Sequence, residues 1–328
     1  MFYKFVQRPG KLTKCPKLFW EFYVINSLNV ASSKIRKKKL KTSKVWGRKI
    51  HTKEEANQLI LKGLEGDKPF FVSRCGNREL RIVILKELMN LDAADGYPKS
   101  VLEGGCNNAG VFPPTPEMAD VFAKIYSEAK MQADVTVYWG HILGEKYLMD
   151  KYAPNAEIIP SRPIEPFGFN KPWTSALKGK KVLVIHPFAK TIEKQYEKRE
   201  GIHKQSDILP EFELKTLKAV QSSAGNDCGF ESWKAALEYM ENEIDKIDFD
   251  VALLGCGGYA VPLGAYIKKM GKKAVVTGGF TQILFGIKGD RWERSRPDIV
   301  AMYNENWVRP DEDDRPEKSK NVEDGAYW

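Results

Sequence analysis

Residues 250–277 constrain the fold more strongly than any other part of this sequence. The apolar run Asp250–Leu254 predicts a buried strand, and the Gly-rich turn Gly255–Tyr259 follows it. The spacing of apolar residues over Val261–Met270 predicts a helix, and Lys273–Thr277 predicts a second strand. Two consecutive strands that are connected through a helix lie parallel in one sheet. Parallel sheets carry helices on both faces, so this unit indicates a layered α/β protein.

The same alternation of short apolar strands and helices extends through residues 51–305. Further strands are predicted at Pro69–Ser73, Val135–Trp139, Lys181–Ile185 and Phe212–Val220. Further helices are predicted at Thr52–Lys62, Glu79–Met89, Thr115–Gln132, His141–Tyr152, Ala189–Glu200 and Glu231–Ile247. The segment Asp92–Pro114, rich in Gly, Asn and Pro, is predicted to be a loop. The expected fold class is therefore α/β, with a layered, Rossmann-like parallel sheet and an N-terminal basic extension.

Composition divides the chain into three zones. Residues 1–50 are an aromatic and then basic N-terminal arm, residues 51–305 are the α/β domain, and residues 306–328 are a polar C-terminal tail. A chain of 328 residues is long enough for one large domain or for two lobes. The sequence therefore leaves open a division of the middle zone into 51–175 and 176–305.

The positive charge of the chain is concentrated in one segment. The net charge is +9, and Lys34–Lys49 holds nine Lys or Arg residues and no acidic residue. The preceding segment, Lys17–Val30, contains four aromatic residues. Aromatic residues beside a polybasic stretch favour an anionic membrane surface, so a peripheral membrane contact is expected through residues 17–49. A solvated arm is the alternative, and a basic run without a nucleic-acid-binding fold does not indicate a specific nucleic-acid site.

Several features of the sequence bear on where the protein works. No apolar run approaches the ~20 residues of a membrane-spanning helix, and the first residues lack the apolar core of a secretory signal. The five cysteines are scattered and form no CxxC pair, which is typical of a reducing compartment. We therefore expect a cytoplasmic protein that contacts the inner face of the membrane peripherally.

The Gly-rich turn at residues 255–258 is the first candidate ligand site, because open parallel sheets bind ligands at the carboxyl ends of their strands. Gly255, Gly257 and Gly258 allow the backbone to approach a ligand, and the following helix offers free N–H groups to an anion. The turn also matches G-x-G-x-x-A, but the next strand ends in Thr277-Gly278-Gly279 without the acid of a dinucleotide site. NAD is therefore not expected, and a plain tight turn is the alternative.

Arg74 and Glu79 lie after the strand at 69–73. A guanidinium at a strand end suits bidentate binding of phosphate or carboxylate. Glu79 begins the next helix and is a candidate general base or a ligand for a sugar hydroxyl. The alternative is that the two side chains pair with each other or that Glu79 caps its helix.

His186 directly follows the strand at 181–185 and is a second candidate catalytic residue, because its imidazole titrates near neutral pH. A hydrogen-bonded structural histidine is the alternative. Gly279 and Gln282 follow the last predicted strand and are expected to line the same crevice. The four histidines show no HxH or HExxH spacing, so no metal site is predicted from them.

Two parts of the sequence resemble a known family. Arg74–Glu79 reads Arg-Cys-Gly-Asn-Arg-Glu and resembles the Arg-x-Gly-Asp-Gly-Glu turn near the start of the GT-D type glycosyltransferase domain. Asp250–Gly279 resembles the strand, Gly-containing turn, helix and strand in the later half of that family. The segments KGKKVLVIHPF and GKKAVVTGG and the terminal Tyr-Trp are similar to uncharacterised proteins encoded among bacterial surface-polysaccharide genes. The resemblance covers residues 65–290.

The resemblance implies a nucleotide-sugar donor whose crevice contains Arg74, Gly76, Asn77 and Glu79. One departure from the family concerns metal binding. Asn77 stands where the family's Asp-x-Glu motif has its Asp, and a hard divalent ion prefers charged oxygen ligands. Glu79 alone makes a weak metal site, so we expect no metal or other cofactor.

These observations predict a glycosyltransferase-like protein of bacterial cell-surface polysaccharide biosynthesis, with a nucleotide-sugar donor and a glycan acceptor. Glu79 or His186 would be the base that activates the acceptor hydroxyl. A non-catalytic nucleotide- or glycan-binding assembly protein of the same pathway is the first alternative. A different sugar- or phosphate-processing enzyme, such as a pyruvyl- or phosphotransferase with His186 catalytic, is the second.

Overall fold

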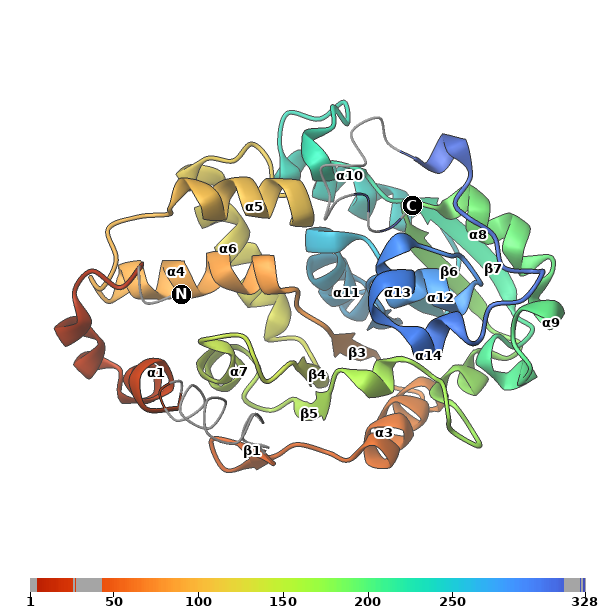
Figure 1. The fold of residues 1–328 in the computed structure, drawn as a ribbon, viewed down its shortest axis with the longest axis horizontal. Helices are drawn as coiled ribbons and strands as arrows, with labels where there is room; N and C mark the ends of the chain where they lie inside the picture. The colour runs from red at the N-terminus through yellow and green to blue at the C-terminus, as the bar shows by residue number, and fades with distance from the viewer. Residues whose placement is uncertain (1–4, 26, 28–42, 316–324, 326, 328) are drawn as a thin grey trace.

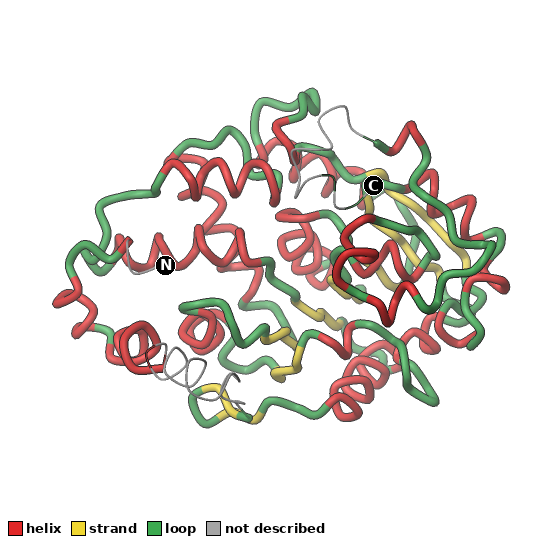
Figure 2. The backbone as a smooth tube through the Cα atoms, in the orientation of Figure 1, coloured by secondary structure: helices red, strands yellow, loops and turns green. Residues whose placement is uncertain are grey.

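The computed structural model describes residues 5–25, 27, 43–315, 325 and 327 and is shown in Figures 1 and 2. Its centre is a seven-stranded sheet in the order β5-β4-β3-β9-β8-β6-β7, and every paired neighbour is parallel. The strands are β3 (Phe70–Ser73), β4 (Val135–Tyr138), β5 (Glu157–Pro160), β6 (Lys181–His186), β7 (Glu213–Lys218), β8 (Val251–Leu254) and β9 (Lys273–Val276). The predicted parallel α/β fold is confirmed.

Helices cover both faces of this sheet, as Figure 1 shows. One face carries α4 (Asn77–Asn90), α5 (Lys99–Ala109), α6 (Pro116–Lys130), α7 (Glu145–Tyr152), α10 (Trp233–Ile244) and α11 (Ala260–Lys269). The other carries α3 (Lys53–Glu65), α8 (Ala189–Tyr196), α9 (Arg199–Ile202), α12 (Phe280–Leu284), α13 (Asp290–Ser295) and α14 (Pro297–Val300). Alternate residues of β6 enter the two cores: Leu183 and Ile185 pack on the first side, and Val182 and Val184 on the second. Burial on both sides explains why these strands read as continuous apolar runs.

Strands from both halves of the middle zone join this one sheet. β3, from residues 51–175, pairs with β9, from residues 176–305, through Phe70–Val72 and Lys273–Val275. One continuous sheet therefore includes strands from residues 51–175 and from residues 176–305, the two ranges that the sequence allowed as separate lobes.

The predicted helix starts are confirmed at two positions where a side chain caps the helix. Thr52 and Glu55 form a capping box at α3, in which each side chain accepts from the other residue's backbone N–H. Thr115 caps α6 by accepting from the Met118 N–H. The helix predicted at His141–Tyr152 begins only at Glu145, and the one predicted at Ala189–Glu200 divides into α8 and α9.

The prediction of a loop over Asp92–Pro114 was wrong, because α5 lies within it. Its glycines allow α5 to pack closely on α4: a methyl group on Gly105 would lie 2.8 Å from Cδ1 of Ile82. Tertiary packing of this kind stabilises helices whose own propensity is low. The helix ends at Gly110, which has the left-handed φ of 75°. The strand β5 was also missed, since Glu157–Pro160 carries only a short apolar pattern.

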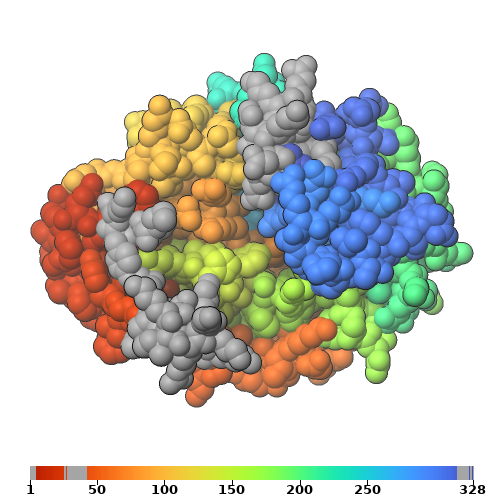
Figure 3. Space-filling view, viewed as in Figure 1, coloured from red at the N-terminus to blue at the C-terminus, as the bar shows by residue number. Residues whose placement is uncertain are grey.

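The described part of the N-terminal zone is not a separate arm. Leu12, Leu18 and Phe22 are fully buried in the core beside α4 and α7, and the zone forms one end of the molecule, red in Figure 3. It includes the short helix α1 (Pro16–Phe19) and the strands β1 (Lys44–Val45) and β2 (Arg48–Lys49). Trp20 is exposed. Most of the basic run, residues 34–42, lies outside the described residues.

The described part of the C-terminal zone also packs on the domain. The buried Asp314 accepts hydrogen bonds from the N–H and the hydroxyl of Thr191 in α8. Residues 316–324, 326 and 328, including Trp328, lie outside the described residues. None of the helices in the described segments combines the length and apolar content that a membrane crossing needs.

Candidate active site

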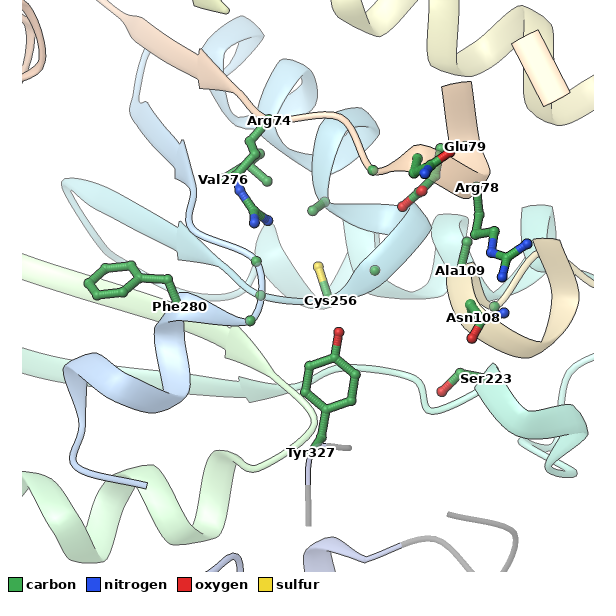
Figure 4. A pocket seen from close by; sticks show the side chains of 18 of the residues that line it. Arg74, Arg78, Glu79, Asn108, Ala109, Ser223, Cys256, Val276, Phe280 and Tyr327 are labelled. Carbon is green, nitrogen blue, oxygen red and sulfur yellow. The ribbon is translucent and has the colours of Figure 1, made fainter. Parts of the chain in front are cut away.

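A cavity of about 630 Å³ opens at the carboxyl edge of the sheet. The segment after β3 leads to α4 on one face, and the segment after the adjacent β9 leads to α12 on the opposite face. Neighbouring connections that leave in opposite directions open a crevice between them. The cavity therefore lies where the topology of the sheet predicts a ligand site (Figure 4).

Most of the residues predicted for the site line this cavity. They are Arg74, Gly76, Asn77, Glu79, His186, Gly255, Gly257 and Gly279. Gly258 and Gln282 are not among the lining residues. Gly258 lies against the end of α5, where a methyl group would be 2.7 Å from the Ala109 carbonyl oxygen. Gln282 is fully buried, and its amide donates to the Tyr327 carbonyl.

Arg74 is held by close packing rather than by a carboxylate. Its guanidinium lies 4.6 Å from the centre of the Trp139 ring, and the Trp139 indole N–H donates to the Cys75 carbonyl at 2.7 Å. Gly278, with a φ of +59°, makes room on the other side, since a methyl group there would lie 2.0 Å from Nη1 of Arg74. Arg74 forms no ion pair within the described residues, and burial lowers the pKa of its guanidinium. An unpaired, partly desolvated cation favours an anionic ligand.

Two glycines that line the cavity have backbone N–H groups without an acceptor among the described residues. The N–H groups of Gly257 and Gly279 have no acceptor in the part of the chain that the structure describes, and both residues line the cavity. Gly257 has a left-handed φ of +58° and opens the turn that leads into α11. Free N–H groups before a helix are suited to bind a phosphate oxygen.

His186 is a hydrogen-bond donor in this geometry. Its Nδ1 accepts from the Phe188 N–H at 3.0 Å, so the proton of the neutral ring lies on Nε2. Burial lowers the pKa of His186 to about 3, which keeps the imidazole neutral at physiological pH. Its Nε2 has no partner among the described residues. The ring therefore fits a donor to a ligand better than a general base.

Glu79 folds back over the start of α4, as the capping alternative proposed. The backbone N–H groups of Arg78 and of Glu79 itself lower the pKa of its carboxyl, and a methyl group on Gly76 would lie 2.1 Å from its Oε2. The side chain is 8% exposed and lines the cavity. Burial raises the pKa of Glu79, whereas Arg74 and Arg78 lower it. A raised pKa makes the Glu79 carboxylate a stronger base than an exposed carboxylate.

The cavity also contains residues that the sequence did not single out. They are Arg78, Arg81, Asn108, Ser223, Arg291 and Tyr327, among others. The Tyr327 hydroxyl accepts from Arg291 at 2.6 Å, and Figure 4 shows that hydroxyl directed towards Cys256. Two of them had a signal in the sequence: Arg78 lies in the Arg74–Glu79 turn, and Tyr327 belongs to the terminal Tyr-Trp pair. No sequence pattern indicated Asn108 or Ser223, because they reach the site only through the packing of α5.

The lining is rich in arginine. Among the described residues, six arginines line the cavity, at positions 74, 78, 81, 162, 291 and 296, and two carboxylates, Glu79 and Glu165. Glu165 is engaged by Arg296 through two hydrogen bonds of 2.8 and 2.7 Å. Arg162 and Arg296 also pair with Asp298. Arg74 and Arg78 form no ion pair within the described residues, which favours an anionic ligand. No group of three or more His, Cys, Asp or Glu side chains suited to a metal ion occurs within the described residues.

No protein-family model, curated protein or solved structure matches this chain.

Proposed function

We propose that the cavity binds a nucleotide-sugar and that the protein is a glycosyltransferase-like enzyme of bacterial cell-surface polysaccharide biosynthesis. The observation that carries the proposal is that Arg74, Gly257 and Gly279 line one cavity, and that within the described residues the Arg74 guanidinium has no ion pair and the two glycine N–H groups have no acceptor. A diphosphate offers oxygens and negative charge to all three donors. The Nε2–H of His186 adds a fourth donor at the same strand ends.

The reaction assigns a separate role to each of these residues. An acceptor hydroxyl attacks the anomeric carbon of the donor sugar, and the bond from that carbon to the diphosphate oxygen breaks. Arg74 and His186 stabilise the negative charge that develops on the leaving diphosphate. Glu79, whose pKa is raised by burial, accepts the proton of the acceptor hydroxyl. We assign the base to Glu79 rather than His186 because the His186 Nδ1 is occupied and its Nε2 carries the proton.

We also propose that the protein works in the cytoplasm, peripherally at the inner membrane face. The support is the basic and aromatic composition of residues 17–49. Within that range Trp20 is 52% exposed, whereas Phe22 is fully buried and contributes to the core instead.

The proposal is tested by calorimetric titration of the full chain with UDP, GDP and their sugars, with and without Mg²⁺ or Mn²⁺. The Arg74→Gln variant should bind the same ligand ~10–100-fold more weakly, as expected for loss of a charge-assisted hydrogen bond. Arg199→Gln is a matched control, because Arg199 pairs with Glu200 outside the cavity. Equal affinity of wild type and Arg74→Gln, in a folded protein, would remove the diphosphate assignment.

One observation favours a second candidate function, a non-catalytic binding or assembly protein. The Glu79 carboxylate is already used to cap α4, and Asn77 offers no charge beside it. A protein of this kind would bind the nucleotide-sugar in the same cavity without turning it over. Release of nucleoside diphosphate coupled to formation of a glycosidic product would exclude it.

A further inference from the structure

The Tyr327 side chain takes up part of the cavity. Its hydroxyl accepts a hydrogen bond from Nη1 of Arg291 at 2.6 Å, and the same guanidinium lies 5.5 Å from the centre of its ring. Its backbone carbonyl accepts from the side-chain amide of Gln282, which is fully buried, at 2.8 Å. The backbone is therefore tied to the wall, and Figure 4 shows the hydroxyl directed into the cavity towards Cys256.

The Tyr327 ring lies beside the groups that we propose to bind the diphosphate. A methyl group on Gly279 would lie 3.2 Å from Cε1 of Tyr327, and a methyl group on Gly278 would lie 2.0 Å from Nη1 of Arg74. Tyr327 and Arg74 therefore pack against neighbouring residues of the turn that follows β9. The ring occupies space directly next to Gly279, whose N–H group has no acceptor in the described part of the chain.

Arg74, Arg291 and the Tyr327 hydroxyl share this end of the cavity. Burial is the main cause that lowers the pKa of the Arg74 guanidinium; Tyr327 raises that pKa, and Arg291 lowers it further. Both groups are therefore within electrostatic reach of Arg74. A phosphate forms bidentate, charge-assisted hydrogen bonds with a guanidinium, whereas a phenol offers a single neutral oxygen. A phosphate group can therefore replace the phenol as the acceptor for Arg291.

We infer that Arg291 is a further binding residue for the diphosphate, and that the Tyr327 hydroxyl occupies the position of one diphosphate oxygen until the ligand displaces the ring. The inference rests on the proposed function for the identity of the ligand. Tyr327 then makes an autoinhibitory contact, because the affinity is reduced by the fraction of molecules in which the ring fills the site. The bond from Gln282 keeps the ring close, so that it returns when the ligand leaves.

The test is calorimetric titration of the full chain with inorganic pyrophosphate and with the nucleoside diphosphates. We expect Tyr327→Ala to bind pyrophosphate about tenfold more tightly than the wild type, as for a site that the ring fills in about nine molecules of ten. Tyr327→Phe, which keeps the ring and loses the hydroxyl, should show a smaller gain. Tyr239→Ala and Tyr266→Phe are matched controls outside the cavity and should change nothing.

A double variant tests the role of Arg291. When Arg291→Gln is added to Tyr327→Ala, pyrophosphate binding should weaken at least tenfold relative to Tyr327→Ala alone, because the released donor is lost. Unchanged affinity in the double variant would remove Arg291 from the site. Equal or weaker binding in Tyr327→Ala, with thermal unfolding unchanged, would overturn the inference and make Tyr327 a ligand contact or a bystander. If Tyr327→Ala unfolds, Tyr327→Phe decides in the same way.

The two probes separate this inference from the proposed function. Tighter pyrophosphate binding in Tyr327→Ala, with no nucleoside diphosphate bound by either protein, supports the displaced ring and contradicts the nucleotide-sugar. Equal nucleoside diphosphate affinities in wild type and Tyr327→Ala support the proposed function and overturn the displaced ring. If neither probe binds to either protein, both proposals fail.

Discussion

The two ends of the cavity hold their arginines in different ways. At one end, Arg74 is enclosed by Trp139 and Gly278, and Gly257 and Gly279, whose N–H groups have no acceptor in the described residues, line the same cavity. At the other end, Arg78 stands on the first turn of α4, and its neighbours Asn108 and Ser223 offer only side chains. Backbone donors and a packed guanidinium lose little entropy on binding, whereas free side chains must be ordered.

This difference suggests a division of tasks between the two ends. The rigid Arg74 end suits a group of fixed geometry, such as the diphosphate of every nucleotide-sugar. The Arg78 end suits a group whose attachment varies, because side chains adapt their positions at a modest entropic cost. Variants that act on one end alone test this division directly.

The largest effect is expected from Glu79→Gln, at the boundary between the two ends. The amide keeps an oxygen that caps α4 but accepts no proton, so turnover should fall by about 100-fold or more. Affinity for the nucleoside diphosphate should change less than threefold. Product formation in a coupled nucleoside diphosphate release assay gives the first value, and calorimetry gives the second.

A matched control for Glu79→Gln is Glu103→Gln, whose exposed side chain pairs with Lys99 outside the cavity. If Glu79→Gln kept wild-type turnover, proton transfer would belong to another group. If it lost binding at either end, Glu79 would act chiefly by positioning Arg74 or Arg78.

Gly278→Ala should affect the Arg74 end alone, with a smaller consequence. The added methyl group would lie 2.0 Å from Nη1 of Arg74, so the guanidinium must leave its place over Trp139. We expect about tenfold weaker binding of the nucleoside diphosphate by calorimetry, since one charge-assisted bond is misplaced. The left-handed φ of +59° adds a loss of about 1 kcal/mol in unfolding free energy.

Gly179→Ala separates those two effects. Gly179 has a similar φ of +71° but open space around it, so it carries the backbone strain without the clash. A comparable loss of stability with unchanged affinity is expected there. Equal affinities in Gly278→Ala and Gly179→Ala would show that Arg74 does not need its present position to bind.

The Arg74 end was largely predictable from the sequence, because its residues follow apolar strands directly. Arg74 and Gly257 lie one and three residues beyond a strand and His186 is the last residue of β6, and parallel strands bring their carboxyl ends to one edge. The roles were less predictable than the positions. His186 is a donor rather than a base because its Nδ1 accepts from the Phe188 N–H. This contact depends on the local backbone geometry, which a sequence pattern does not predict.

The Arg78 end was not predictable to the same degree. Its wall is α5, whose Gly- and Asn-rich sequence reads as a loop and forms a helix only by packing on α4. Ser223 is more than 100 residues from α5 in the sequence, and the hydrogen bond from the Ser222 hydroxyl to the Gly110 carbonyl brings it to the end of that helix. The buried core of the N-terminal zone was missed for a similar reason, since Leu12 and Leu18 gain their burial from α4 and α7 rather than from a periodic pattern.

The smallest predicted effect concerns pH and the support behind Arg74. The Glu145 carboxylate accepts from the N–H groups of Trp139 and Gly140, at 2.8 and 2.9 Å, and so orients the ring beneath Arg74. Burial raises the pKa of Glu145 to about 7, with Lys130 lowering it and the buried Glu21 raising it. A folded pKa above the unfolded value favours the protonated folded form. Its contribution to stability is therefore full below pH 4.5 and is lost as the pH rises towards 7.

We expect Glu145→Gln to remove about 1 kcal/mol of the fall in unfolding free energy between pH 6 and pH 8, measured by urea denaturation. Glu21, whose pKa burial also raises to about 7, supplies a similar slope that the variant keeps. A wild-type curve that matches the variant over this range would mean that Glu145 is ionised in both states. A variant that flattens the curve and also weakens nucleoside diphosphate binding at pH 8 would show that this carboxylate supports Arg74.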